Sequence, residues 1–489
     1  MKRMMVGVML GVSVLGSPSP TSAQTPVTLS LEDALARSVP ASETLELAKA
    51  AVLRARGEQH RAKAERYPQL NANISFNRLL ESQFANFDFG DFSSDTSSGG
   101  GFEDLPFGRP NTYTFGLSFS QTLYAGGRLA GQAQSADAGH RSASLGVTAA
   151  TAQLMLDVVS AYYDAVLADR QLAIARAVLA QADSTLTRTE QRYGVGAEAE
   201  FEVLRARVAR NNQRTSVILR DNERDVAHVR LTQMLDLPID QPLELVTSLG
   251  DAVPSGTPTL TEFLETPSDT SAEHRVAVRQ AAEAVQVQEG AVRVAKAQRL
   301  PALVVTSQYG RLGYPSGVSP FRTDFLSDWN VAVGVQFPLF TGGRLAGERD
   351  VAEAGLREAE LRFRQAAKLA RLDTRTAFSG LTAAEAAWEA SEGTVGEAER
   401  AYRIAETMFQ EGISTQTELL DARVAWQTSQ LIRVQAARDL QVARVRVALI
   451  QQLPVPGLSG ASSGASQTRQ ASQPQRATPI AATGTGIIP

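Results

Sequence analysis

The stretch Gly126-Gly127-Arg128-Leu129-Ala130-Gly131 recurs unchanged 216 positions later, beginning at Gly342. The same spacing separates Leu237-Pro238 from Leu453-Pro454, so the segments between these landmarks align without net insertion. A repeat of about 200 residues is far longer than the repeats of solenoid proteins. The chain is therefore interpreted as a tandem duplication.

Each half opens with a helical segment that ends at a proline, Pro68 or Pro301, where an α-helix cannot continue. These prolines are 233 positions apart, so one change in length precedes the glycine pairs. Alternation of apolar and polar residues then predicts strands, because successive side chains of a strand point to opposite faces. We predict four strands, at residues 67–80, 112–124, 301–311 and 328–340.

A long helical run without proline follows each glycine pair, and at 1.5 Å per residue it makes a helix of about 100 Å. Each run stops at a glycine and a second helix returns, which predicts helical hairpins at residues 127–237 and 343–453. Small residues at alternating spacings of four and three predict a coiled-coil seam in which helices approach closely. The seam comprises Leu154, Val158, Ala161, Ala165, Ala168, Leu172, Ala175, Leu179, Ala182 and Leu186.

The composition excludes several classes of function. The chain has 489 residues, a formal net charge of -4, 4 His and no Cys. The lack of cysteine excludes disulfides, thiolate metal sites, cysteine nucleophiles and a lipid anchor on cysteine. The histidines are scattered and no nucleophile is paired with a base, so we expect no catalytic residue, no metal and no cofactor. The slight acidity argues against nucleic-acid binding.

The two ends of the chain differ from its middle. Residues 1–23 are typical of a secretory signal peptide, with Lys2 and Arg3 before an apolar stretch and Thr21-Ser22-Ala23 at its end. No other window approaches about 20 uninterrupted apolar residues, so a membrane crossing would use strands. Residues 455–489 are rich in Ser, Gly, Gln, Ala and Pro, which predicts a disordered tail.

Four strands cannot close a barrel, because the smallest barrels have about eight, so several chains must contribute. Hairpins of this length do not fold into one compact globule either. We therefore predict a mainly α fold with β-strands, assembled as an oligomeric tube. A periplasmic coiled-coil scaffold that never enters a membrane is the alternative, which the alternating strands disfavour.

The order of proline, strand, loop, strand, glycine pair and hairpin, found twice, resembles the TolC-like outer-membrane efflux family over residues 28–454. The resemblance implies a homotrimeric tube in which each chain gives four strands to a twelve-stranded outer-membrane barrel, continued by an α-helical barrel in the periplasm. It divides the chain into repeats at 24–250 and 251–454, with loops at 81–111 and 312–327 between the strands.

The resemblance also implies a function and partners. Members of the family are passive exit ducts of tripartite export systems, which work with a periplasmic adaptor, or membrane fusion protein, and indirectly with an inner-membrane transporter. The implied location is the outer membrane and the periplasm. Small-molecule efflux and type I protein secretion use the same kind of duct, and both remain open.

In this family, carboxylates six and nine residues after a turn glycine line the periplasmic aperture. Here they correspond to Glu418 and Asp421, which follow Gly412, and Glu202 is the counterpart of the first of them in the other half. Arg205 stands where the second carboxylate would be in that half. Rings of acidic side chains favour cations. The alternative is that these are ordinary solvated helix charges.

The family's closed gate is held by a tyrosine and an arginine near the second turn. Phe409 and Ser414 stand in their places here, and Phe409 can pack but cannot donate a hydrogen bond. The resemblance also assigns adaptor docking to the two turns, although these are equally explained as helix–helix turns that need glycine at positive φ. The docking residues would be Gly194, Val195, Gly196, Gly412, Ile413 and Ser414.

The glycine pairs Gly126-Gly127 and Gly342-Gly343 are predicted to turn the chain from barrel to helix. A glycine-rich junction between a strand and a helix also suggests phosphate binding, but no downstream Lys-Ser/Thr or acidic residue completes that motif. Residues 81–110 hold six Phe and six acidic residues and would form an extracellular loop. Its phenylalanines either pack on the barrel rim or cap the mouth.

Overall fold

The computed structural model of the protein describes residues 26–80, 110–250, 272–315, 317–318 and 324–457. The chain packs as two compact units, and each draws on both repeats. We call the described residues of 42–157, 258–387 and 442–489 the sheet unit, and those of 1–41, 158–257 and 388–441 the hairpin unit. The predicted signal peptide, nearly all of the loop at 81–111 and most of the tail lie outside the described residues.

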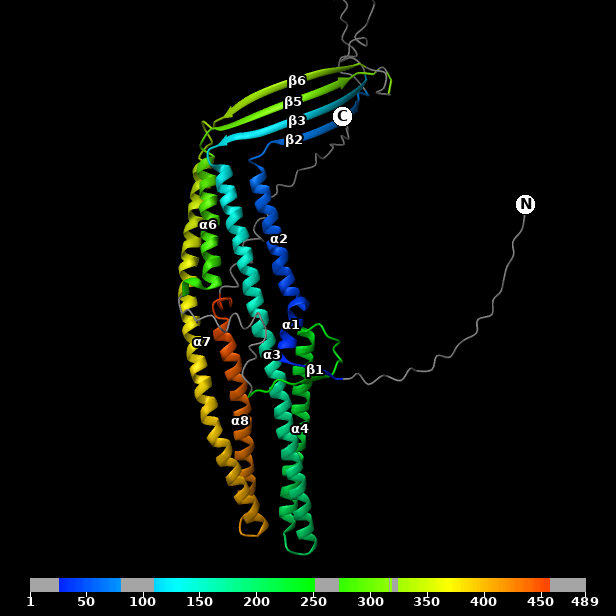
Figure 1. The fold of residues 1–489 in the computed structure, drawn as a ribbon, viewed down its shortest axis with the longest axis vertical. Coiled ribbons are helices and arrows are strands. Elements are labelled where there is room, and N and C mark those ends of the chain that lie inside the picture. The colour runs from blue at the N-terminus through cyan, green and yellow to red at the C-terminus, as the bar shows by residue number, and fades with distance from the viewer. Residues whose placement is uncertain (1–25, 81–109, 251–271, 316, 319–323, 458–489) are drawn as a thin grey trace, which may run out of the picture. The chain divides into compact units, whose positions relative to one another are not determined.

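The sheet unit contains a four-stranded antiparallel sheet of β2 (Gln69–Arg78), β3 (Asn111–Ala125), β5 (Ala302–Gly313) and β6 (Phe325–Gln336), in the order β2-β3-β5-β6 (Figure 1). The central pairing of β3 with β5 joins the two repeats, and it contains a register shift between Thr122 and Tyr124. Four strands combined with long helices confirm the predicted fold class.

The two faces of the sheet differ in chemistry, as alternation requires. The register places Ile74, Phe115 and Arg311 in one cross-strand row and Leu117, Tyr309 and Trp329 in the next one, all on a largely apolar face. The opposite face carries small and polar side chains. They include Asn71, Asn73, Ser75, Thr114, Ser118, Ser120, Thr306, Gln308, Asn330 and Gln336.

Helices α2 (Glu43–Ala64) and α6 (Val276–Ala297) complete the sheet unit, with the first parts of α3 (Arg128–Gly194) and α7 (Arg344–Gln410). Helices α3 and α6 approach so closely that a Cβ atom added to Gly290 would lie 2.6 Å from the carbonyl oxygen of Gly131. Nearby, Arg141 binds Glu283 through two nitrogens, with Nη2 2.8 Å from Oε2. Glycine therefore decides how near these two helices can come.

Arg275 is a fully buried arginine in the sheet unit, directly before α6 and after the 3₁₀ turn Ala272–His274. Its guanidinium donates to Asp373 Oδ2 at 2.9 Å and to the carbonyl oxygen of Leu453 at 3.2 Å. Burial lowers the pKa of Arg275, and the charge of Asp373 opposes that shift. The guanidinium thus joins three segments that lie far apart in the sequence, through the ion pair with Asp373 and the hydrogen bond to Leu453.

The hairpin unit contains the rest of α3 and α7, together with α1 (Leu31–Ala41), α4 (Glu200–Met234) and most of α8 (Gln416–Ala448). Strand β1 (Val27–Leu29) pairs in parallel with β4 (Leu243–Leu245). The buried Tyr162 hydroxyl ties β1 and the segment after β4 to α3, since it donates to the Leu29 carbonyl at 2.9 Å and accepts from the Thr247 amide at 3.0 Å.

The predicted seam of α3 is largely buried from Val158 to Ala175. Beyond Ala175 the buried positions become Val178, Ala182, Thr185 and Thr189, whereas Leu179 and Leu186 are half-buried. Ala175 and Ala182 of the predicted seam thus stay buried, whereas Val178 and Thr185 take the places of Leu179 and Leu186 in the buried stripe.

Among the helices in the described ranges, α3 alone has an 18-residue stretch apolar enough to cross a membrane by length and composition, with a mean hydropathy of 1.3. A single such helix is weak support for a helical membrane span, because the core helix of a soluble protein has the same composition. Here the stretch belongs to a helix of 67 residues that turns back at Gly194.

Candidate functional site

Both helical hairpins turn at a glycine in the left-handed region, with φ of +76° at Gly196 and +73° at Gly412. At the second turn the amide of Ile413 donates to the carbonyl of Met408 at 2.8 Å, and Gly412 donates to Phe409 at 3.1 Å. The first turn repeats this pair of bonds, which is the Schellman motif of a helix C-terminus. Each turn therefore requires its glycine for backbone geometry.

The second turn leads into α8 through a reciprocal cap. The Thr415 amide donates to Glu418 Oε2 at 3.0 Å, and the Glu418 amide donates to Thr415 Oγ1 at 3.3 Å. This capping box satisfies two amides at the start of the helix. The Glu418 carboxylate is thus held in place by the backbone, and Asp421 lies exposed one helical turn further on.

The first turn lacks such a cap. Ala199 is the N-cap residue of α4 and makes no side-chain bond, although its φ of -84° and ψ of 148° suit one. Glu202 is half-buried, and its Oε2 atom has no hydrogen-bond partner among the described residues. The two carboxylates that occupy equivalent positions in the repeats therefore have different surroundings.

The contact between the two hairpins at the turns is made by Arg192, which lies in the last turn of α3. Its Nη2 atom donates to the carbonyl oxygen of Gln410 at 3.1 Å, and its guanidinium lies 5.8 Å from the ring centroid of Phe409. A cleft of about 500 Å³ beside this contact is also lined by Arg188, Thr189 and Val195. The buried Ser414 hydroxyl has no partner in the described part of the chain.

Sequence reasoning missed Arg192, because arginines are frequent on these helices and no motif marks this one. The sequence indicated only Phe409 and Ser414 of the second hairpin as candidates for a gate, whereas the donor of this contact belongs to the first hairpin. Phe409 does pack at the contact, as the aromatic partner of the guanidinium.

A second connection between the hairpins lies further along the helices. The buried Arg423 of α8 donates to Thr185 of α3 at 2.9 Å. Beside it, Tyr402 stacks on Trp426 with ring centroids 5.0 Å apart. Burial raises the pKa of the Tyr402 hydroxyl, the charge of Arg423 opposes that rise, and Glu406 adds to it. Neither Arg423 nor Tyr402 was singled out from the sequence.

Two acidic residues of α3 form further ion pairs within the hairpin unit. Asp164 accepts from Arg438 Nε of α8 at 2.7 Å. Asp169 lies 3.0 Å from both His228 Nε2 and Arg224 Nε of α4. Burial alone would raise the pKa of Asp169, but these two partners hold it below its ordinary value.

The glycine pairs lie between strand and helix, Gly126-Gly127 between β3 and α3 and Gly342-Gly343 between β6 and α7. All four have positive φ, from +58° to +92°. A Cβ atom on Gly126 would lie 2.6 Å from Leu300 Cβ, so this position also lacks room for a side chain. The first pair thus has both a conformational and a steric reason for glycine.

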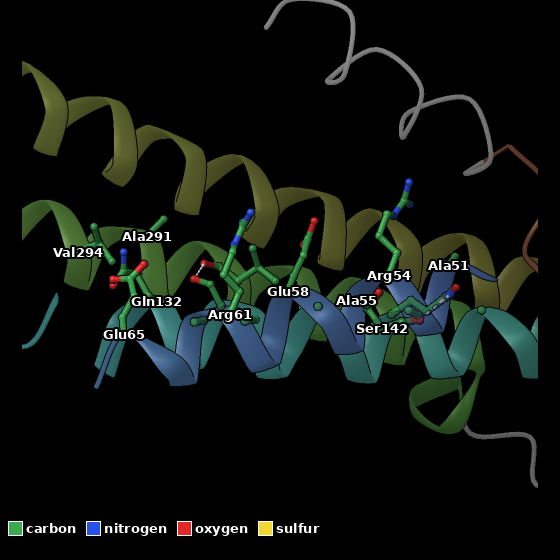
Figure 2. A pocket seen from close by; sticks show the side chains of 18 of the residues that line it. Ala51, Arg54, Ala55, Glu58, Arg61, Glu65, Gln132, Ser142, Ala291 and Val294 are labelled. Carbon is green, nitrogen blue, oxygen red and sulfur yellow. Dashed lines mark hydrogen bonds between the residues drawn. The ribbon is translucent and has the colours of Figure 1, made fainter. Parts of the chain in front are cut away.

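A groove of about 800 Å³ lies between α2, α3 and α6 of the sheet unit (Figure 2). Alternating charges of α2 line it, namely Arg54, Glu58, Arg61 and Glu65, and the remaining lining is mostly alanine and glycine. In the described part of the chain, no three His, Cys, Asp or Glu side chains lie together as metal ligands would.

A four-stranded amphipathic sheet and two long helical hairpins in one chain are typical of a channel subunit of the outer membrane. The chain belongs to the outer membrane efflux protein family, whose model matches residues 34–236 and 268–451. The two matched segments correspond to the two repeats. The protein is therefore an outer-membrane efflux channel of the TolC type and not an enzyme.

Similar proteins include the pyoverdine export outer membrane protein OpmQ of Pseudomonas aeruginosa, 24% identical over 431 residues that cover 86% of this chain and 83% of that protein. The outer membrane protein TolC of Vibrio cholerae is 25% identical over 313 residues, or 63% of this chain and 69% of that protein. The crystal structure of the CmeC outer membrane channel of Campylobacter jejuni has the same fold, with a TM-score of 0.71, 16% identity and 88% of each chain covered.

Proposed function

We propose that three copies of the chain form a passive exit duct through the outer membrane. The observation that supports this proposal is the sheet, in which the edge strands β2 and β6 are each paired on one side only within the described residues. Unpaired backbone groups are not tolerated in lipid, so further chains must cover both edges. Three copies give a closed barrel of about twelve strands, wide enough for a channel. The leader predicted at 1–23 would direct the chain out of the cytoplasm.

Electron microscopy of the detergent-purified protein tests the assembly, and conductance in planar bilayers tests the channel. A tapered particle with threefold symmetry and stable unit conductance are expected. A compact monomer without conductance would refute the proposal. A soluble particle in the periplasmic fraction would favour the coiled-coil scaffold instead.

Glu418, Asp421 and Glu202 are proposed to form acidic rings at the periplasmic aperture. The surroundings of Glu418 permit a sharp experiment, because glutamine preserves a capping box whereas alanine does not. Glu418→Gln combined with Asp421→Asn should lower the preference for cations and weaken block by divalent cations, without loss of thermal stability. Glu397→Gln, at an exposed position on α7, is the matched control. Unaltered selectivity in the double variant would mean that these are ordinary solvated charges.

The turns at Gly194, Val195, Gly196 and at Gly412, Ile413, Ser414 are proposed to dock a periplasmic adaptor, through which an inner-membrane transporter delivers substrate. Val195 is 80% exposed and Ile413 is 71% exposed, as docking requires. The chain has no cysteine, so a single introduced cysteine is a clean cross-linking probe. Val195→Cys or Ile413→Cys should cross-link to a co-expressed adaptor, and Val208→Cys on α4 should not. Equal labelling at all three positions would contradict docking at the turns.

The contact of Arg192 with Phe409 and Gln410 is proposed as the latch that holds the two hairpins together at the closed aperture. It differs from the family arrangement because the cationic donor lies on the first hairpin. Phe409 keeps a packing role in it, and no bond through Ser414 is included.

A small molecule is the proposed cargo. The supporting observation is the likeness to OpmQ, which is named for the export of pyoverdine and which aligns over 86% of this chain. Deletion of the gene should raise the intracellular content of a small exported compound. Loss of a secreted protein from the medium, with unchanged small-molecule content, would favour type I protein secretion.

A further inference from the structure

The apolar face of the four-stranded sheet carries two charged side chains in the described strands, and both are arginines, Arg78 and Arg311. Strand alternation and the register of the sheet place both on the face that also bears Phe76, Phe115 and Trp329. The opposite face carries Asp328 and is otherwise uncharged within the strands.

Both arginines lie at the same end of the sheet. Arg78 is the last residue of β2, and Arg311 is two residues from the end of β5. These are the ends that lead to the inter-strand loops, whereas α3 and α7 follow the opposite ends of β3 and β6. In a duct whose helices stand in the periplasm, the loop ends face the cell exterior. The positive charge of the apolar face is thus confined to the level of the outer leaflet, an orientation that rests on the proposed function.

The ring of Phe325 lies near Arg311, and no ion pair joins Arg311 to a carboxylate of the described residues. Its guanidinium is 6.0 Å from the ring centroid of Phe325, which makes an edge contact with Phe115 at 5.4 Å. Its cross-strand neighbours are Phe115 on β3 and Ser327 on β6. The guanidinium is therefore exposed on the lipid-facing side without a counter-charge from the described residues.

A lone cation on a lipid-facing surface is destabilising unless it reaches the polar boundary and finds an anion there. Aromatic residues gather at that boundary, where their rings sit among the lipid headgroups. The planar guanidinium fork binds phosphate oxygens with two parallel hydrogen bonds. The position, the aromatic neighbours and the unmatched charge all fit an anionic group supplied by the membrane.

We propose that Arg311 binds the phosphate group of an outer-leaflet lipid, with Arg78 as a second, weaker contact. The aromatic side chains beside Arg311 pack on the lipid around the phosphate. This is a lipid-binding site on the outer surface of the barrel, separate from the conduction path and from the hairpin turns.

Native mass spectrometry of the detergent-purified full-length protein tests the site, with bisphosphorylated lipid A and its dephosphorylated form as the two probes. Wild type should retain the phosphorylated probe, and Arg311→Gln should bind it at least about fivefold more weakly. Arg311→Lys should recover part of the affinity, since it restores the charge without the fork. Arg78→Gln should have a smaller effect, and Arg357→Gln, at an exposed position on α7, should have none.

Equal binding of both probes by wild type, or unchanged binding by Arg311→Gln, would overturn the proposal. Conductance of the same preparations separates this result from failure of the proposed function. A conducting protein without phosphate selectivity refutes the lipid site alone, whereas a protein that forms no channel refutes the duct. If Arg311→Gln does not assemble, the comparison of the two probes on wild type and Arg311→Lys decides.

Discussion

Arg192→Met should loosen the contact between the two hairpins and shift the duct towards its open state. Methionine keeps much of the aliphatic side chain, so packing is largely preserved. Besides a loose ion pair of 3.9 Å with Glu198 within the first hairpin, two interactions with the second hairpin are lost. These are the hydrogen bond to the Gln410 carbonyl at 3.1 Å and the contact with the Phe409 ring at 5.8 Å.

The size of the effect follows from the surroundings of the guanidinium. A hydrogen bond from a charged group contributes about 1.5–3 kcal/mol when shielded, and about 1 kcal/mol at a half-exposed position such as this one. A cation–π contact at an exposed site adds about 0.5–1 kcal/mol. The loss is therefore about 1–2 kcal/mol per chain, or roughly a tenfold change in the closed-to-open ratio of one hairpin pair. If the three chains open together, the effects multiply.

Single-channel recording in planar bilayers measures this ratio directly. Arg192→Met should raise the fraction of time in the high-conductance state. Arg188→Ala removes a positive charge one helical turn away, from a side chain that makes no hydrogen bond to the described residues of the other hairpin, and it should leave the fraction unchanged. An equal open fraction in wild type and Arg192→Met would refute the latch. If Arg192→Met and Arg188→Ala raise the open fraction equally, the effect comes from the change in net charge and not from the contact.

Four further predictions concern stability, each measured by thermal unfolding in detergent. Asp373→Ala leaves a fully buried arginine without its counter-charge and should cost about 3–5 kcal/mol, whereas exposed charges cost far less. Gly290→Ala places a Cβ atom 2.6 Å from a backbone oxygen and should destabilise by about 1–3 kcal/mol, while Gly139→Ala has open space and should be neutral or stabilising. The pKa of Asp169 is depressed in the folded state, so its stabilisation is present above pH of about 4 and is lost as the pH falls through the folded pKa; Asp169→Asn should flatten that acid-side loss. Ala199→Thr would complete a capping box at α4 and should stabilise by about 0.5–2 kcal/mol, and no gain would show that the backbone there does not accept the cap.

Alternation and glycine report backbone geometry directly, so local patterns can indicate strands and turns, with bounds that differ by a few residues: the strand predicted at 328–340 lies at Phe325–Gln336. The strand predicted at 112–124 corresponds to β3 at Asn111–Ala125, and both turn glycines have positive φ. Local patterns do not predict that β3 pairs with β5, or that the register shifts near Tyr124. Both features depend on contacts between segments nearly 200 residues apart. Arg192 was missed for a related reason. Its partners on α7, Phe409 and Gln410, come close only through the packing of the two hairpins.

The two repeats share the glycines that the backbone of each turn requires, but they differ in the side chains beside those turns. Gly196 and Gly412 are equivalent, 216 positions apart, and both close a Schellman turn. Three residues further on, Ala199 corresponds to Thr415, so only the second hairpin has a capped returning helix. The lack of an N-cap bond destabilises a helix by about 1 kcal/mol. This free energy is comparable to that of the proposed latch contact beside the same turns. The first hairpin thus carries the donor of the proposed latch yet lacks a side-chain cap on its returning helix. If the aperture opens at these turns, α4 should begin to move before α8.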